Sequence, residues 1–290
     1  MELRQLRYFV IVAEELNFNR AAEHLLVAQP ALSQQIRHLE EELGVSLFDR
    51  SRRQIQLTAA GSTLLTEARK LLAELDKAIR ISQRAGRGEL GRLIIGCTPI
   101  ASWLLPDIMR VYQEHFPEVK VMVEELLSFE QVHALQQLQI DVAITLGAPE
   151  DANLSRKLIS SLPSLIAFPT HPTSTIRTSP FILWKELAAY PFIMFPRRIQ
   201  TQLFDQFVSR CQSAGYSPTI VKEVAQIETI LNLVSAGIGI APVPAYLQEM
   251  VQWKGMAFQA LEEPAPKFEI FVLWRSNDSS PTLQNFLQVL

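Results

Sequence analysis

The first fifty residues carry the hydrophobic spacing of short amphipathic helices. A first helix is predicted by the apolar positions Leu3, Leu6, Phe9, Val10 and Ala13. Asn19 is a suitable N-cap for a second helix over residues 20–26. After the break VAQP, a third helix is predicted in which Pro30 fits the first turn and the buried stripe is Leu32, Ile36, Leu39 and Leu43. Two short helices joined by a tight turn indicate a helix-turn-helix.

The polar face of the third helix has an unusual distribution of charge. No carboxylate occurs from Gln29 to Leu39, and the acids are bunched at positions 40–42. Glutamine can bond adenine and arginine can bond guanine in the major groove, whereas a carboxylate there would face phosphates. The face therefore predicts a DNA-recognition helix, and we expect DNA contacts from Asn19, Arg20, Gln29, Pro30, Ser33, Gln34, Arg37 and His38.

The segment VSLFDRSRRQIQLT, which follows Gly44, alternates as two short strands around a turn. Phe48 should be buried, while Arg50, Arg52 and Arg53 should be exposed. Three neighbouring arginines also occur in ordinary solvated turns. Beside a recognition helix, they favour a basic wing that contacts phosphates.

A long helix is predicted from a cap at Thr58 to Gly86, without an interrupting proline. Its apolar stripe has the period of a coiled coil, and we expect it to dimerise through Leu65, Leu72, Leu75 and Ile79. The alternative is that the stripe packs against its own domain. The Gly-rich segment 84–92 is typical of a hinge.

From Leu93 onward, strands alternate with helices, which predicts an α/β domain with largely parallel sheets. The predicted strands are LIIG, KVMVEEL, DVAITLG, LIAF, FIMF, TIVKEV and FEIFVLW. Helices are predicted near 104–115, 129–138, 200–214, 227–236 and 281–290.

Some sixty residues near the N-terminus resemble the DNA-binding domain of LysR-type transcriptional regulators. The resemblance runs through LRYF, AAEHL, QPALSQQIRHLEEELG, LFDR and LTAAG, and it continues more weakly in LIIGCTPIASWLLP, IDVAI and LVSAGIGIAPVP. The family usually has Ser or Thr before QPALS, where this chain has Ala28. Loss of such a cap costs about 1 kcal/mol.

The resemblance implies an α/β protein with an N-terminal all-α winged helix-turn-helix domain over residues 1–58. A linker helix for dimerisation and a hinge would follow over 59–92. A regulatory domain that resembles two-lobed periplasmic binding proteins would occupy 93–290. Its lobe I would comprise 93–161 and 267–290, and its lobe II would comprise 162–266.

An effector cleft is predicted where strands end, because ligands of α/β sheets bind beyond their carboxyl ends. Hydroxyls and free N–H groups at these ends suit an anion, with either Thr98 or Ser102 in the first loop. In relatives that sense aromatic acids and muconate, residues matching Ser128, the CTPIAS loop and Pro196 resemble effector ligands. The candidate residues are Thr98, Pro99, Ile100, Ser102, Ser128, Phe129, Pro196, Arg197 and Gln226. The alternatives are ordinary helix caps for the hydroxyls and a solvated loop for Arg197.

Composition and motifs exclude several other classes. The net charge of −3 does not itself indicate nucleic acid, so the DNA hypothesis rests on pattern. We find no apolar run long enough for a membrane span, no signal peptide and no metal or catalytic motif. These absences favour a cytoplasmic regulator without cofactor or metal over an enzyme or a secreted solute-binding protein.

The sequence thus predicts a homodimeric or homotetrameric regulator that binds double-stranded promoter DNA and responds to a small effector, expected to be a carboxylate. The alternative is a redox-responsive or effector-independent regulator of the same fold. A thiol switch would involve Cys97 and Cys211, the two cysteines of the chain.

Overall fold

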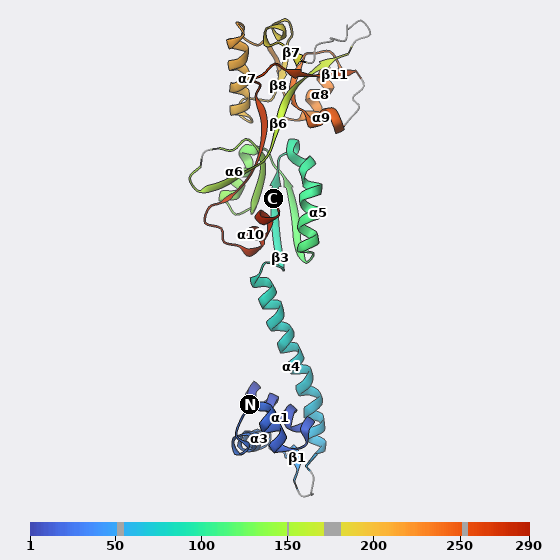
Figure 1. Cartoon of the computed structure of the whole chain (residues 1–290), viewed down its shortest axis with the longest axis vertical. Coiled ribbons are helices and arrows are strands. Elements are labelled where there is room, and N and C mark those ends of the chain that lie inside the picture. The colour runs from blue at the N-terminus through green and yellow to red at the C-terminus, as the bar shows by residue number, and fades with distance from the viewer. Residues whose placement is uncertain (51–54, 150, 171–180, 251–254) are drawn as a thin grey trace. The chain divides into compact units, whose positions relative to one another are not determined.

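The computed structural model divides into two compact units, Met1–Arg84 and Ala85–Leu290 (Figure 1). It describes residues 1–50, 55–149, 151–170, 181–250 and 255–290. None of the described helices is long and apolar enough to cross a membrane.

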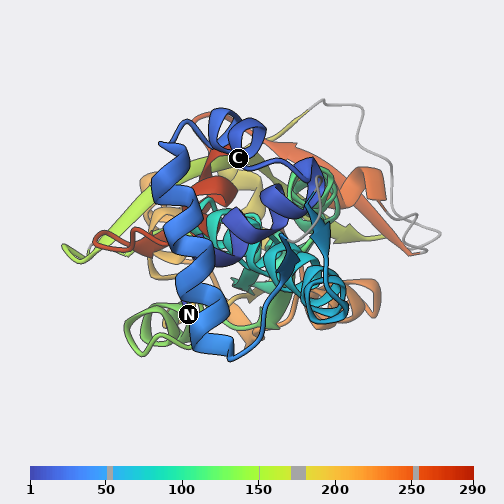
Figure 2. The same ribbon diagram turned by 90° about the horizontal axis from the view of Figure 1, so that it is seen from below.

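Helices α1 (Leu3–Glu15), α2 (Phe18–Leu25) and α3 (Gln29–Leu43) cross one another in the first unit (Figure 2). They bury the predicted apolar stripes, and Phe9, Leu32, Ile36 and Leu39 are each 0% exposed. Leu43 is an exception to the prediction, because it is exposed in the last turn of α3.

The predicted cap of the second helix was wrong by two residues. The N-cap of α2 is Asn17, whose Oδ1 accepts hydrogen bonds from the N–H groups of Asn19 and Arg20. Both asparagines have the residue type of a cap, and the earlier one has the extended backbone that a cap requires.

The predicted hairpin after α3 is confirmed. Strand β1 (Phe48–Asp49) pairs antiparallel with β2 (Gln56–Leu57). Phe48 is buried as predicted, and its ring centroid lies 5.5 Å from Phe9 and 5.8 Å from Phe18. The hairpin is therefore fixed to the helices by an aromatic cluster.

Helix α4 (Ala59–Gly86) begins at the predicted cap, with Thr58 Oγ1 accepting the N–H of Gly61. Gly61 closely approaches the preceding segment, since a Cβ atom there would lie 2.1 Å from the carbonyl oxygen of Leu47. The apolar stripe of α4 is divided. Its first half, including Leu65, Ala68 and Leu72, packs against the core of its own unit, whereas Ile79 in its second half is 43% exposed.

The second unit is built on a mixed sheet with the order β4-β3-β5-β12-β6-β11-β7, and β10 also pairs with β6. The strands are β3 (Gly91–Cys97), β4 (Val119–Glu125), β5 (Val142–Leu146), β6 (Leu154–Pro169), β7 (Phe181–Ile182), β10 (Ala241–Pro244), β11 (Met256–Leu261) and β12 (Lys267–Arg275).

The expectation of largely parallel sheets was wrong. Strand β3 is parallel to β4 and β5, but β12 is antiparallel to both β5 and β6. Strand β6 is also much longer than the predicted LIAF segment, at 16 residues. It pairs with β12 up to Pro163 and with β10 from Ser164 onward, so it runs through both lobes. Because the chain leaves lobe I through β6 and returns through β12, these strands must run in opposite directions.

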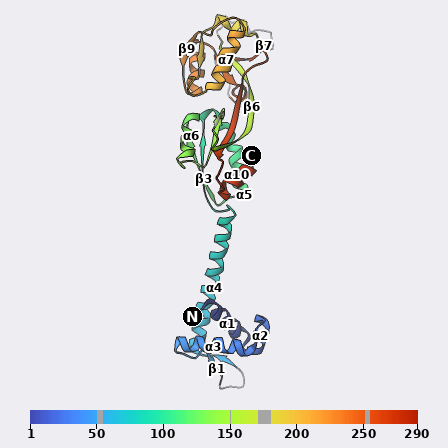
Figure 3. The same ribbon diagram turned by 90° about the vertical axis from the view of Figure 1, so that its left-hand side faces the viewer.

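Helices cover both faces of the lobe I sheet (Figure 3). Helices α5 (Leu105–His115) and α10 (Pro281–Gln288) pack on one face, and α6 (Ser128–Gln136) packs on the other. Short 3₁₀ helices lie at Pro99–Leu104 and Trp184–Ala189. Lobe II adds β8 (Phe192–Met194), β9 (Ile220–Glu223), α7 (Thr201–Ser213), α8 (Ile227–Ser235) and α9 (Tyr246–Met250).

Candidate functional site

The polar face of α3 presents free side chains to solvent. Gln34 and Arg37 are exposed, and neither side chain has a hydrogen-bond or ion-pair partner among the described residues. At the start of the helix, Pro30 lies in the first turn and Ala28 provides no side-chain cap. The side chain of Gln29 donates to Ser33 Oγ over 2.8 Å. The central positions of this face are thus available for base contacts.

The acids at the end of α3 have structural partners. Glu40 accepts the backbone N–H groups of Leu47 and Phe48 and forms a 3.0 Å ion pair with Arg50. Glu42 pairs with the N-terminal ammonium group, which lowers the pKa of its carboxyl. Glu40 therefore joins the end of α3 to the hairpin that follows it. These carboxylates anchor the wing and the N-terminus away from the first turns of α3.

His38 is exposed, and its ring is also hydrogen-bonded to a side chain of α1. The Gln5 side chain accepts the N–H of Glu2, so its amide nitrogen is the donor to His38 Nδ1, at 3.0 Å. The same nitrogen lies 3.3 Å from Gln35 Oε1. This arrangement fixes the neutral ring as the tautomer with a proton on Nε2. The sequence pattern did not single out Gln5, since it lies on an otherwise apolar helix face.

The remaining predicted DNA contacts are partly engaged within the unit. Asn19 and Arg20 lie in the first turn of α2, and Arg20 is 3.1 Å from Glu15. Arg50 lies over the ring of Phe18 at 5.3 Å besides its pairing with Glu40. Arg52 and Arg53 lie outside the described residues.

A cavity of about 380 Å³ lies between the two lobes. Lobe I contributes the start of α6 and residues 146–149, and lobe II contributes residues 198–202. Its apolar wall consists of Phe129, Val132, Leu146, Ala148, Pro149 and Ile199. Its polar lining consists of Ser128, Arg198, Gln200, Thr201 and Gln202. The volume is in the range of small-molecule sites.

The polar side of the cavity is suited to an anion. Helices α6 and α7 both begin at this cavity, and the first N–H groups of a helix have no partner within it. Ser128 Oγ donates to the carbonyl of Leu146 and accepts a 3.4 Å bond from Gln200 Nε2. Arg198 is exposed, and its guanidinium has no ion-pair partner among the described residues. The cavity therefore combines a cation, hydroxyls and two helix N-termini beside an apolar wall.

The structure brings Arg198 to this cavity in place of Arg197. The guanidinium of Arg197 forms a bidentate pair with Asp205, with distances of 2.6 and 2.7 Å. The hydrogen bond to Asp205 raises the pKa of Arg197, and the same bond lowers the pKa of Asp205. Arg197 already has its anion, so its expected role as the ligand cation conflicts with the geometry.

The other predicted effector residues lie apart from the cavity lining. Thr98 and Ile100 are 4% and 5% exposed, and Ile100 belongs to the hydrophobic core. Pro196 is buried, and its carbonyl accepts the N–H groups of Ile199 and Gln200. Pro99 lies in the first turn of the 3₁₀ helix, and Ser102 and Gln226 are exposed elsewhere. Of the nine candidates, Ser128 and Phe129 line the cavity.

Gln200 is a residue that the sequence analysis missed. Its side chain is 7% exposed, and it spans from lobe II to Ser128 of lobe I. A signal was present, because Gln200 immediately precedes α7 and follows a predicted strand. An amide residue in such a loop is common, however, and only the fold brings it opposite Ser128.

Both cysteines are buried thiols. Cys97 is 2% exposed in one hydrophobic cluster and Cys211 is 0% exposed in another. Burial raises the pKa of Cys97 to about 12, with a smaller contribution from Glu125, and burial also raises the pKa of Cys211. Such thiols are poor nucleophiles, so the geometry does not favour a redox switch.

Comparison with known proteins identifies two family matches. Residues 3–62 match the bacterial regulatory helix-turn-helix family of lysR type, and residues 86–290 match the LysR substrate binding domain. The HTH-type transcriptional regulator AlsR of Bacillus subtilis (strain 168) is 34% identical over 290 residues, which cover 100% of this chain and 95% of that protein.

Two solved structures are similar over the full chain. The structure of CbnR, a LysR family transcriptional regulator, has a TM-score of 0.82 and 29% identity, with 100% of this chain and 99% of that chain covered. CbnR complexed with its target DNA has a TM-score of 0.80 and 29% identity, with coverage of 100% and 98%. Relatives that match are transcriptional regulators and not enzymes, as the sequence predicts.

The first prediction concerns the exposed face of α3. Replacing Gln34 or Arg37 by alanine should weaken binding to a specific site by about 1–3 kcal/mol, because each can bond one base edge. Binding to random DNA should change little. Fluorescence anisotropy with specific and random duplexes measures both. Gln83→Ala, an exposed glutamine of α4, is the control, and equal losses on both duplexes for Gln34→Ala would refute the assignment.

The second prediction concerns the pH dependence of thiol reactivity. Because the pKa of Cys97 is raised to about 12, the thiolate fraction of the folded protein stays small at pH 8.5, where a free cysteine is about half ionised. Iodoacetamide should therefore label Cys97 and Cys211 slowly at pH 8.5 in the native protein and rapidly in guanidinium chloride. Mass spectrometry of the labelled peptides measures this, and rapid labelling of the native protein at pH 8.5 would contradict the thiol environment described above.

Proposed function

Because this chain belongs to the LysR family of transcriptional regulators, we propose that it binds promoter DNA through α3 and the wing and that a small organic acid bound between its lobes alters that binding. The chain is a DNA-binding regulator with an effector-binding domain. The class of effector, the residues that bind it and the mode of assembly are parts of the proposal.

The lining of the 380 Å³ cavity is the observation that carries the choice of effector. Arg198 offers an unpaired cation, and the starts of α6 and α7 offer N–H groups to the same space. A carboxylate matches these donors better than a sugar, which would leave the cation without a counter-charge. The apolar wall suits a ligand with a hydrocarbon body.

The hydrogen bond between Gln200 and Ser128 supports an effect on lobe geometry. It is a direct polar contact from lobe II to lobe I, at 3.4 Å. A carboxylate near Ser128 would compete for these two donors. The relative position of the lobes would then depend on whether the ligand forms stronger hydrogen bonds than the one that it replaces.

We further propose assembly through the second half of α4. The first half already buries Leu65, Ala68 and Leu72 against its own unit, whereas Ile79, farther along the same stripe, is 43% exposed. Leu75 is only partly covered and lines an apolar hollow beside α1. An exposed apolar stripe on a long helix favours pairing with a second helix, and a dimer or tetramer of this chain would supply one.

The third prediction tests the effector site. A thermal-shift screen of small aliphatic and aromatic acids should yield a ligand, and isothermal titration should then show that Arg198→Ala weakens its binding by about 1.5–3 kcal/mol. Ser128→Ala should weaken it by about 1 kcal/mol. DNA binding without effector should be unchanged, since the substitutions lie in a different unit.

Arg197→Ala is the matched control for this experiment. It removes the same charge from the neighbouring position, but this guanidinium is held by Asp205, so ligand affinity should stay within about twofold. If Arg197→Ala weakens the ligand as much as Arg198→Ala does, the assignment of the cation is wrong. A screen in which no acid stabilises the protein would reject the carboxylate proposal itself.

The fourth prediction tests assembly. Leu75→Asp together with Ile79→Asp would bury unpaired charge in the proposed helix pair, which is strongly unfavourable. Light scattering should show a loss of dimers with an unchanged circular dichroism spectrum. Lys77→Asp with Arg80→Asp, on exposed positions of the same helix, should leave the mass unchanged. An unaltered mass for the leucine and isoleucine variant would disprove pairing through this stripe.

A further inference from the structure

The chain segment that follows α4 is held by the first two turns of α10. Asn285 Nδ2 donates a 2.8 Å hydrogen bond to the carbonyl of Arg87. Gly88 is buried with φ +71°, and a Cβ atom there would lie 2.5 Å from the backbone of Pro281 and 2.7 Å from that of Thr282. We refer to Arg87 and Gly88 as the linker root. The backbone of the linker root thus packs directly against the backbone of α10.

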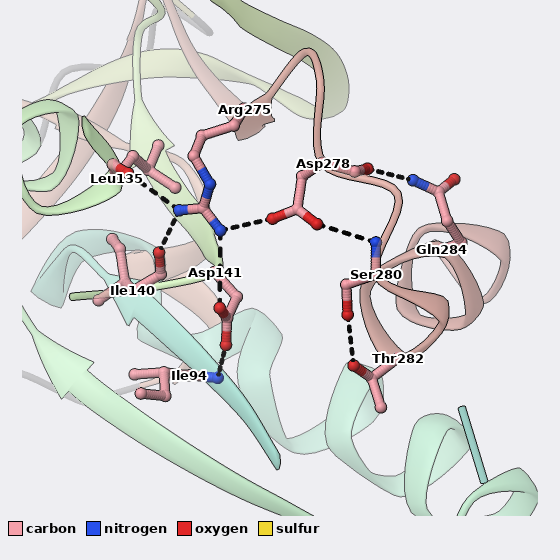
Figure 4. A network of polar contacts seen from close by, with 9 residues as sticks. All are labelled: Ile94, Leu135, Ile140, Asp141, Arg275, Asp278, Ser280, Thr282 and Gln284. Carbon is pink, nitrogen blue, oxygen red and sulfur yellow. Dashed lines mark hydrogen bonds and ion pairs between the residues drawn. The ribbon is translucent and has the colours of Figure 1, made fainter. Parts of the chain in front are cut away.

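The start of α10 is also hydrogen-bonded to Asp278 (Figure 4). Asp278 Oδ1 accepts the N–H of Ser280 at 2.9 Å, and its carbonyl accepts the side chain of Gln284 at 2.9 Å. Ser280 Oγ lies 2.9 Å from Thr282 Oγ1. The carboxylate of Asp278 therefore determines where the N-terminus of α10 lies.

Arg275 joins Asp278 to the C-terminal end of α6 (Figure 4). One guanidinium nitrogen donates to the carbonyls of Leu135 and Ile140, at 2.9 and 2.7 Å, and the other donates to Asp278. Asp141, 3.6 Å from the guanidinium, accepts the N–H of Ile94 at 2.8 Å.

The side chains of Arg275 and Asp278 are 13% and 14% exposed. Removing Arg275 would leave the carboxylate of Asp278 without its cation in a poorly solvated position, which is unfavourable. The planar fork of arginine reaches two carbonyls and a carboxylate at once, which a lysine ammonium cannot reproduce.

We propose that Arg275, Asp278 and Asn285 are positioning residues that couple α6 to the linker root. Helix α6 begins at Ser128 in the cavity and is only 9 residues long, so its two ends move together. A displacement at Ser128 is transmitted to the carbonyl of Leu135, then through Arg275 and Asp278 to α10, and from Asn285 to Arg87. That the cavity is the source of the signal rests on the proposed function, whereas the coupling itself does not.

Hydrogen–deuterium exchange of the full-length protein without effector tests the coupling from both ends. Arg275→Lys keeps the charge but loses the fork, so amides over 136–141 and over 85–90 should both exchange about three- to tenfold faster, as expected for the loss of one or two hydrogen bonds. Asn285→Leu acts from the opposite end. Because coupling between two sites is reciprocal, it should accelerate exchange at 136–141 as well as at the linker root.

Matched controls distinguish an effect of the Arg275–Asp278–Asn285 contacts from a general destabilisation of the regulatory domain. Arg110→Lys changes an exposed arginine of α5 whose neighbours are Asp107 and Glu114. Gln288→Leu changes an exposed residue one turn beyond Asn285 on α10. Neither control should alter exchange at 136–141 or at 85–90.

The outcomes distinguish coupling from local support. If Arg275→Lys accelerates 136–141 alone and Asn285→Leu accelerates 85–90 alone, the two ends are independent and the inference is wrong. If Arg275→Lys does not fold, Asn285→Leu decides the matter, since it leaves the buried ion pair intact. If both variants act at both ends but no acid alters exchange at either, the coupling holds and the proposed effector role of the cavity fails.

Discussion

Strand β6 is the constraint on which the rest of the second unit depends. Its first part pairs with β12 in lobe I, and from Ser164 onward it pairs with β10 and β11 in lobe II. Ser164 Oγ also donates to the carbonyl of Pro266, where the return strand approaches. The lobes therefore share continuous backbone hydrogen bonding, and they can differ in relative position only through small bending at this crossing. Residues of both lobes line the cavity beside this crossing, and a small ligand in it would therefore contact both.

In the first unit, some polar side chains are hydrogen-bonded or ion-paired within the unit and others are not. Glu40 satisfies two backbone N–H groups and Arg50, and Gln5 satisfies Glu2 and His38. These side chains hold the wing and α1 against α3. Gln34 and Arg37 have no hydrogen-bond or ion-pair partner among the described residues. The described part of this unit thus leaves unpaired polar groups on a face of α3, and base edges in duplex DNA offer partners of the kind that such groups can bond.

The sequence predicted local structure much better than long-range pairing. Periodicity was sufficient for α1 to α8 and for α10, because the buried positions of a helix recur every three or four residues, whereas the five-residue α9 was missed. Strands β10 and β11 and the full length of β6 were missed, because their pairing partners lie far along the chain and β10 contains two prolines. The cap of α2 was misplaced because two asparagines fit the local pattern. Of the predicted effector residues, Ser128 and Phe129 line the cavity, at a point where a strand end and a helix start coincide, whereas Thr98 and Ile100 are buried away from it.

The arginines show why residue type alone could not identify the site. Arg197 and Arg198 are adjacent and chemically identical, yet Asp205, one turn into α7, pairs with the first and leaves the second at the cavity. Arg275 carries the same guanidinium in a third setting, where two carbonyls and a carboxylate accept hydrogen bonds from it. What a cation does is determined by how many of its donors the fold has already satisfied. An arginine without a partner can select an anionic ligand, whereas one that is hydrogen-bonded to several elements can transmit a displacement between them, because the groups that it holds move with it.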